Sequence, residues 1–419
     1  MGRRVLRVDS WTGRPGGGQE YVRSVADELA AAGHEQRLIQ LTDWRSEAPR
    51  PDERVVTASP TRFARLGRDL VADPALVRAF HEELRSFRPD LVHVHHFDAS
   101  FTPLARLLAE SDVPLLLTAH DAELVCPIST LVRPGRVVCD GGVRTRCQFT
   151  GCHVGLGGPY NLWQRRVFDA RVLPRVRVYL CPSRRLAEYL DANGYRPAVH
   201  LPPFARIPPS VRSGPFGPPA AGGPRRIGYI GRLEPYKGVH DLLDAVARLA
   251  AHRPELRLSI AGDGPSRGPL AERAARLGLA DRVEFAGHVE GAAKEAWYRS
   301  VEMVVVPSNA WENFGLVALE ALTRERPVVA TDFGGLPDVV QDRETGRLVP
   351  LSDPPALAAA IDELLNDPVT ARRYALEGRR RSLERFTPEV HVRRLLAVYD
   401  AILAGRKLPS LSRAADLLP

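Results

Sequence analysis

Two acidic residues, Glu312 and Glu320, flank the expected start of a helix at residues 313–316. A carboxylate accepts hydrogen bonds from two hydroxyl groups at once, which suits the vicinal diol of a sugar or a ribose. The backbone amides at a helix start have no partner inside the helix and attract phosphate. The segment therefore predicts a site for a sugar, a phosphate and a ribose. The alternative is a pair of solvated acids on an ordinary helix.

Two basic residues, Arg232 and Lys237, lie on a short turn that directly follows an apolar run ending at residue 230. Arginine binds phosphate through a planar fork of N–H groups, and lysine binds it as a point charge. We expect the two side chains to clamp a diphosphate. The alternative is two solvated cations on a surface loop.

Two glycine-rich turns also follow expected strands. Gly16, Gly17 and Gly18 precede the first expected helix, and Gly262 and Gly264 lie in the turn at residues 261–265. Glycine allows the backbone amides to approach a ligand closely, although a plain tight turn has the same composition. Neither turn has the G-x-G-x-x-G or Walker pattern, so the glycines alone identify no nucleotide site.

The elements that must position these loops alternate between short apolar runs and longer helical patterns, which is typical of parallel α/β layers. A Pro- and Gly-rich stretch at residues 202–224 breaks this alternation. We therefore predict an N-terminal domain at residues 1–205, a linker at 206–224, a second domain at 225–386, and a helix with a poorly packed tail at 387–419. The expected strands are residues 4–8, 91–94, 114–118, 176–181, 226–230, 256–261, 283–286, 303–307 and 327–330.

The 419-residue chain carries a formal net charge of +8, which favours anionic partners. No dense block of lysine and arginine is present, so we expect no nucleic-acid partner. The N-terminus lacks the apolar region of a signal peptide, and no apolar run approaches the length of a membrane span. We expect a cytoplasmic protein.

A basic stretch near residue 170 contains Arg165, Arg166, Arg171, Arg175 and Arg177. Two alternatives stay open for it, namely peripheral contact with anionic lipid on the inner membrane face or a solvated helix face.

Four of the five cysteines cluster in an irregular stretch, with 12, 7 and 4 residues between them; they are Cys126, Cys139, Cys147 and Cys152. Such a cluster predicts either a structural zinc site, with His153 as a substitute ligand, or free thiols. The fifth, Cys181, is expected to be a buried apolar residue of a strand.

The sequence resembles family 4 of the glycosyltransferases, which have the GT-B fold. The segments that carry the resemblance are GGGQEYVRSVADELAAAGHE, TAHD at residues 118–121, GYIGRLEPYKGVHDLLDA, LSIAGDGP, VEFAGHVEG, VVPSNAWENFGLVALEAL and ATDFGGLPDVV. They cover the second domain almost throughout, and the first domain mainly at its glycine turn, its strands and TAHD. The resemblance implies two doubly wound Rossmann-like domains that face each other across a cleft, with the C-terminal helix crossing back to the N-terminal domain.

The resemblance implies a role for each matching residue. His120 and Glu312 would be catalytic and, with Asn313, would contact the transferred hexose, while Glu320 would accept the ribose hydroxyls. Val289 and Gly264 would lie beside the ribose and base. The donor diphosphate would be held by Gly17, Gly18, Arg232, Lys237, Phe314, Gly315 and Leu316.

Members of this family retain the anomeric configuration and need neither a divalent metal nor a cofactor. In agreement, the sequence has no Asp-x-Asp pair of the kind that holds Mg²⁺ or Mn²⁺ on a diphosphate. The resemblance implies a nucleotide sugar as donor, with UDP-sugars favoured, and an acceptor hydroxyl on a small molecule, a lipid or a glycan. The alternatives are a GT-B epimerase or phosphorylase and a non-catalytic nucleotide-sugar-binding protein.

Overall fold

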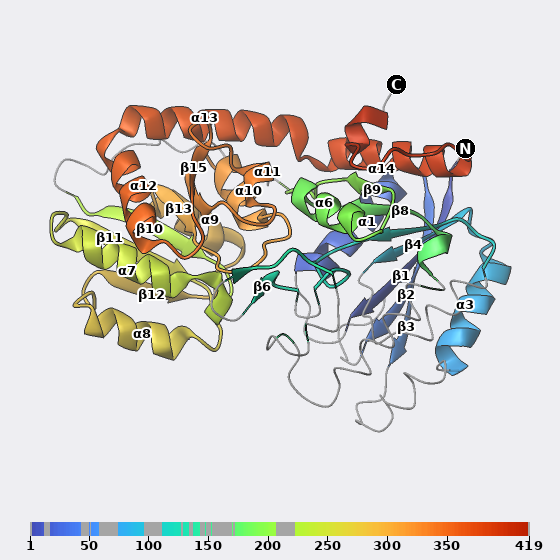
Figure 1. The fold of residues 1–419 in the computed structure, drawn as a ribbon, viewed down its shortest axis with the longest axis horizontal. Helices are drawn as coiled ribbons and strands as arrows, with labels where there is room; N and C mark the ends of the chain where they lie inside the picture. Colours follow the sequence, from blue (N-terminus) through green and yellow to red (C-terminus); the bar gives the residue numbers. More distant parts are fainter. Residues whose placement is uncertain are drawn as a thin grey trace. The chain divides into compact units, whose positions relative to one another are not determined.

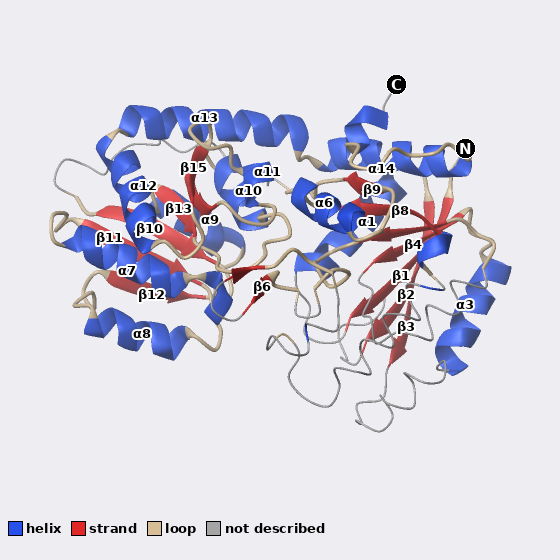
Figure 2. Cartoon of the chain, in the orientation of Figure 1, coloured by secondary structure: helices blue, strands red, loops and turns tan. Residues whose placement is uncertain are grey.

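The structure is a computed structural model of the chain and describes residues 2–11, 17–42, 50, 52–57, 74–95, 111–126, 129–133, 137–142, 147, 152, 170, 172–206 and 223–417. The chain divides into two compact units. The N-terminal unit comprises Met1–Pro202 together with Pro388–Pro419, and the C-terminal unit comprises Pro203–Thr387. Each unit is built on its own sheet (Figures 1 and 2). No helix in the described ranges is long and apolar enough to cross a membrane.

The N-terminal unit contains a seven-stranded sheet in the order β3-β2-β1-β4-β5-β8-β9, and every neighbouring pair is parallel. Every residue of the central strands β4 and β5 is buried, as expected for a sheet that is covered on both faces. The strands are β1 (Arg4–Trp11), β2 (Glu35–Thr42), β3 (Glu53–Thr57), β4 (Leu91–His95), β5 (Leu115–Thr118), β8 (Val176–Cys181) and β9 (Ala198–His200).

Helices α1 (Gly17–Ala31), α3 (Pro74–Ser86) and α6 (Arg184–Ala192) belong to this unit, as does the C-terminal helix α14 (Pro388–Leu403), which packs against α1. The return of the C-terminal helix to the N-terminal unit is thus confirmed. Residues 403–413 are mostly exposed, as the predicted poor packing implies, but the tail is attached to the unit at specific points. The backbone of Leu411 donates a hydrogen bond to Ala198, and Ala414, in the 3-10 helix η4 (Ala414–Leu417), is fully buried.

The C-terminal unit has a six-stranded parallel sheet in the order β12-β11-β10-β13-β14-β15. In chain order this is the 3-2-1-4-5-6 arrangement of a doubly wound Rossmann fold, with its switch point between β10 and β13. The strands are β10 (Arg225–Ile230), β11 (Leu256–Ala261), β12 (Val283–Gly287), β13 (Met303–Val306), β14 (Val328–Thr331) and β15 (Gly346–Val349).

Helices cover both faces of this second sheet (Figure 1). Successive strand residues enter different cores, as the two-residue period of a strand requires: Val305 packs with one group of helices, and Val304 and Val306 pack with the other. The first group is α7 (Val239–Ala250), α8 (Arg267–Arg276) and α12 (Pro354–Asn366); the second is α9 (Gly291–Ser300), α10 (Leu316–Thr323) and α11 (Leu336–Val339). The long helix α13 (Pro368–Arg385) follows α12 and packs against α10.

Candidate active site

Two loops of the C-terminal unit meet at the switch point of its sheet, one after β10 and one after β13. The backbone N–H of Asn309 donates to the carbonyl of Tyr236 over 2.8 Å, which joins the loops directly. Gly238 has a φ of +71°, and a Cβ atom at this position would lie 1.8 Å from the carbonyl oxygen of Pro307. Only glycine therefore fits the point where the loops touch. Ligands of doubly wound sheets bind at such a point.

The contact between these loops brings together Lys237 and Glu312, two of the predicted site residues. The Nζ atom of Lys237 lies 2.6 Å from Oε1 of Glu312, and the hydroxyl of Ser308 donates to the same oxygen. Burial alone would lower the pKa of Lys237, but the carboxylate of Glu312 more than offsets this, so the pKa lies above its ordinary value. The ammonium group therefore stays charged beside the carboxylate. Within the described residues, Oε2 of Glu312 makes no hydrogen bond and is available to a ligand hydroxyl.

A third loop, after β14, fixes the backbone of Glu312. The N–H of Gly335 donates to the carbonyl of Glu312 over 2.6 Å. Gly334 has a φ of +62°, and a Cβ atom there would lie 2.3 Å from the same carbonyl oxygen. The hydroxyl of Thr331 donates to the carbonyl of Ser308 over 2.9 Å. The segment FGGLPD thus supports the carboxylate-bearing loop, a contribution that the sequence patterns did not reveal.

Helix α10 begins directly after this loop. Its N-cap is Gly315, with a φ of +100°, and its first residue is Leu316, so Glu320 lies about one turn inside the helix, as predicted. Phe314 is buried and packs edge-to-face on Phe386, so only its backbone could meet a ligand. The side-chain oxygen of Asn313 is buried and has no hydrogen-bond partner within the described residues. A buried acceptor of this kind is costly unless a ligand supplies a donor.

Two residues of α9 hold the carboxylate of Glu320. Lys294 Nζ lies 2.7 Å from Oε1, and the hydroxyl of Tyr298 donates to Oε2 over 2.9 Å. Burial, and then the nearby carboxylate, raises the pKa of Tyr298, which therefore stays protonated. Neither residue was among the predicted site residues, because no local pattern connects α9 with a glutamate 22 and 26 positions further along the chain.

In the N-terminal unit, His120 follows strand β5. Its Nε2 atom lies 3.1 Å from Nδ1 of His95, the last residue of β4, and its ring packs edge-to-face on Tyr21 of α1 with centroids 5.3 Å apart. Gly17 and Gly18 are the first two residues of α1, which places them at a helix start as predicted, whereas Gly16 lies outside the described residues.

Tyr21 also connects α1 with the C-terminal helix. The Nδ1 atom of His391 lies 2.8 Å from the carbonyl oxygen of Pro202, which can only accept, so Nδ1 carries the proton. Burial lowers the pKa of His391 to about 4, and the neutral ring therefore accepts the Tyr21 hydroxyl at Nε2 over 2.9 Å. His93 is similarly buried, with a pKa lowered to about 3, and bonds Thr118 and Tyr399 over 2.7 Å each.

Comparisons with known proteins identify the family of this chain. A model described as Glycosyltransferase Family 4 matches residues 15–205, and one described as Glycosyl transferases group 1 matches residues 215–381. A glycogen synthase from Mycobacterium tuberculosis is 30% identical over 97% of this chain and 96% of its own length. The chain belongs to glycosyltransferase family 4. A phosphatidyl-myo-inositol mannosyltransferase from Mycobacterium leprae is 27% identical over 93% of this chain and 94% of its own length.

Solved structures place the glycosyltransferase in the GT-B fold class. Sucrose-phosphate synthase from Thermosynechococcus elongatus superposes with a TM-score of 0.70 at 25% identity, covering 96% of this chain and all (100%) of the other. Anabaena HepE in complex with UDP-glucose superposes with a TM-score of 0.68 at 20% identity, covering 95% of this chain and 100% of the other, a likeness of fold. The predicted α/β architecture of two Rossmann-like domains is therefore confirmed.

Other predicted residues of the glycosyltransferase lie near this centre without joining it. The guanidinium group of Arg232 is exposed and bonds its neighbour Glu234 over 3.0 Å. Gly264 belongs to the turn after β11, which packs on the loop after β10. Leu233 of that loop donates a backbone hydrogen bond to Asp263 and accepts one from Ser266, on either side of Gly264. Val289 packs against the apolar core that includes α9 and α10. Their predicted contacts with the donor stay predictions.

The described cysteines of the glycosyltransferase form no disulfide bond. Among the described residues, which include all five cysteines, no group of three or more His, Cys, Asp or Glu side chains is arranged to hold a metal ion. Cys126, Cys147, Cys152 and Cys181 are buried, and Cys139 is partly exposed. The predicted substitute ligand His153 and the arginines Arg165, Arg166 and Arg171 lie outside the described residues. The two alternatives for the cluster stay predictions.

Proposed function

We propose that this glycosyltransferase moves a hexose-type sugar from a nucleotide-sugar donor, with UDP-sugars as the favoured class, to the hydroxyl group of an acceptor. We propose further that it retains the anomeric configuration and uses no metal ion. The observation that carries the proposal is the ion pair of Lys237 and Glu312 at the sheet switch point, directly beside the start of α10. This arrangement offers a cation and free amides for a diphosphate next to a carboxylate for the sugar.

Positive charge on the protein takes the place of a divalent ion in this proposal. Lys237 and Arg232 lie on one loop, and the first amides of α10 follow Glu312 by only a few residues. As the donor bond breaks, negative charge develops on the departing phosphate. Fixed donors and cations that are already in place stabilise such charge without having to reorganise.

The proposed reaction breaks the bond between the anomeric carbon and the phosphate oxygen of the donor. The acceptor oxygen forms a bond to the same face of the anomeric carbon, and its proton passes to the departing phosphate oxygen. No protein nucleophile takes part. Glu312 would hold hydroxyls of the transferred hexose through Oε2, which accepts no hydrogen bond from any residue that the structure describes, and His120 keeps its predicted role as a contact to that sugar.

The relatives leave the acceptor class open. They are named for glycogen and for phosphatidyl-myo-inositol, which are a glycan and a lipid. The donor half of the proposal is therefore the half to test first. A thermal-shift panel of UDP-, GDP- and ADP-sugars should show stabilisation by one nucleotide class, since a ligand that binds the folded state stabilises it by an amount that grows with the logarithm of its excess over Kd. UDP-glucose is a suitable first member.

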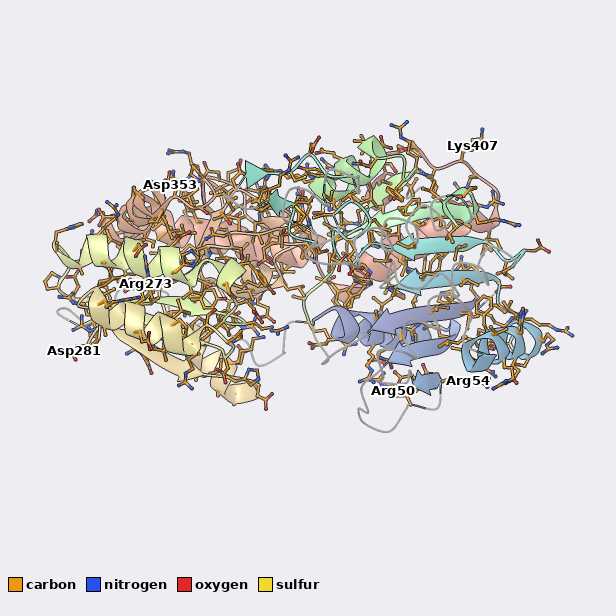
Figure 3. The ribbon with its side chains drawn as sticks, turned by 60° about the horizontal axis from the view of Figure 1, so that its bottom comes forward. Arg50, Arg54, Arg273, Asp281, Asp353 and Lys407 are labelled. Carbon is orange, nitrogen blue, oxygen red and sulfur yellow. The ribbon has the colours of Figure 1, made fainter. Side chains whose placement is uncertain are left out.

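Variants then test the assigned roles. Lys237→Met and Glu312→Gln should each lower turnover by about 100-fold, because each removes a charged contact to the reacting part of the donor. Arg273→Ala is the matched control, since it breaks an ion pair of similar length, 2.6 Å to Asp244, between α8 and α7 (Figure 3). The control should keep wild-type turnover.

Two outcomes would contradict the proposal. The donor assignment fails if no nucleotide sugar stabilises the wild-type protein at millimolar concentration. The role of the ion pair fails if Lys237→Met and Glu312→Gln turn over donor as fast as Arg273→Ala. Release of nucleotide without sugar transfer to any acceptor would instead favour hydrolysis over transfer.

A further inference from the structure

The sequence contains only three lysines, Lys237, Lys294 and Lys407, because arginine supplies almost all of its 58 basic residues. Two of the three pair with the two glutamates of the candidate site. Lys237 bonds Glu312 over 2.6 Å, and Lys294 bonds Glu320 over 2.7 Å. We propose that Lys294 is a specificity-determining residue that orients Glu320 for the ribose diol of the donor nucleotide. The inference deepens the proposed function and rests on it.

The hydrogen bonds of Glu320 show how such orientation would work. A carboxylate has about four acceptor positions, two on each oxygen. Lys294 fills one on Oε1 and the Tyr298 hydroxyl fills one on Oε2, so each oxygen keeps a position. Two free positions on adjacent oxygens match the 2′- and 3′-hydroxyls of a ribose. The side chain of Glu320 is 27% exposed, so a ligand can reach it.

The groups behind these two donors hold them in place. The ring of Tyr298 is buried, with 1% exposure, and the guanidinium of Arg324 lies 4.7 Å from its centroid. Arg324 in turn forms a fork onto both carboxylate oxygens of Glu295, with its Nε at 2.9 Å and 3.1 Å. The Tyr298 hydroxyl is thus fixed against Oε2 of Glu320, and Lys294, on the same helix, binds Oε1.

The chemistry favours lysine over arginine at position 294. An ammonium group is a compact charge that bonds one oxygen, whereas a guanidinium fork tends to engage both oxygens of a carboxylate. A fork on Glu320 would occupy the positions that the ribose needs. Within the described residues Lys294 makes one hydrogen bond, so two of its three N–H donors remain for the nucleoside.

The test measures binding of UDP, GDP and ADP by calorimetry, and then compares the tightest-binding nucleotide with its 2′-deoxy form. In the wild-type protein the ribonucleotide should bind about 10- to 100-fold more tightly, the range for one hydrogen bond to a charged group. Lys294→Met keeps the apolar stem and removes the charge, and it should weaken ribonucleotide binding and bring this ratio close to one. Lys294→Arg keeps the charge and should also lower the ratio, because its fork covers Glu320.

Lys407→Met is the matched control, since Lys407 is exposed and lies in the other unit, beyond α14 (Figure 3). It should keep the wild-type ratio. A wild-type ratio in Lys294→Met would overturn the proposal for Lys294, even though nucleotide binding itself had been shown. A wild-type ratio in Lys294→Arg would overturn the argument for lysine. Absence of binding by all three nucleotides to the wild-type protein would instead overturn the proposed function on which the inference rests.

Discussion

Two buried histidines should make the N-terminal unit sensitive to mild acid. His391 and His93 have folded-state pKa values of about 4 and about 3, against an ordinary value of 6.5, and burial is the first cause in both cases. Below pH 6.5 the unfolded chain takes up protons that the folded unit does not. Stability is therefore fully present above pH 6.5 and is lost as the pH falls toward the folded-state values.

The size of the effect follows from the shift in pKa. pH 5 lies about 1.5 units below the ordinary pKa, so the imidazole is protonated in the unfolded chain while the buried ring is still neutral. This difference in protonation lowers the free energy of unfolding by about 2 kcal/mol for each histidine. Together they should cost about 4 kcal/mol between pH 7 and pH 5, a large part of the about 5–15 kcal/mol that stabilises a typical domain.

The perturbation that isolates one of them is His391→Gln, which removes the ionisable group. Urea unfolding at pH 7 and pH 5, followed by circular dichroism, should show that the wild-type protein loses about 2 kcal/mol more than the variant over this interval. The intrinsic cost of the substitution is present at both pH values and cancels. His288→Gln, at a residue whose side chain is 74% exposed in the C-terminal unit, should lose as much as the wild type. Equal losses in the wild type and His391→Gln would refute the reasoning.

Three further predictions concern the rest of the molecule. Gly238→Ala should destabilise the C-terminal unit by about 3 kcal/mol or more, because the new Cβ meets the Pro307 carbonyl at a positive φ; urea unfolding measures this, and a loss under about 1 kcal/mol would contradict it. His120→Ala should lower turnover by about 100-fold while the donor Kd changes by less than about threefold, as steady-state rates and calorimetry can show. Elemental analysis should find less than about 0.1 zinc ion per chain if the cysteines are free thiols, whereas a stoichiometric amount would show the zinc alternative to be right.

The sequence predicted the architecture well where strands are mostly apolar. Residues 176–181 and 256–261 match β8 and β11 at both ends. It missed β2, whose sequence EQRLIQLT mixes polar and apolar residues, and the short strands β3, β9 and β15. The short strands β3, β9 and β15 all lie at edges of the described sheets, where one side has no neighbouring strand and the apolar signal is weak. The attachment of the tail was also missed, because the pairing of Leu411 with Ala198 is a contact between distant segments.

The same limit applies to the candidate site. Glu312 and Lys237 could be predicted because each follows a strand, and strand ends of a parallel sheet converge at its switch point. Ser308 could also have been predicted from the sequence, since it lies in the same loop as Glu312. Lys294 and Tyr298 could not be predicted, because they contact Glu320 through the packing of α9 on α10. The helical periodicity of α9 identifies its buried face but not the residues that this face contacts.

Glu312 and Glu320 are held by the same types of hydrogen-bond donor, although they lie on different elements. Each carboxylate receives one ammonium and one hydroxyl: Lys237 and Ser308 for Glu312, and Lys294 and Tyr298 for Glu320. Both donors of Glu312 converge on Oε1 and leave Oε2 for the ligand, whereas the donors of Glu320 divide between the two oxygens and leave a position on each. Each carboxylate keeps two of its four acceptor positions, on one oxygen in Glu312 and on both oxygens in Glu320. The bonds that hold each carboxylate therefore also determine the geometry in which it can accept ligand hydroxyls.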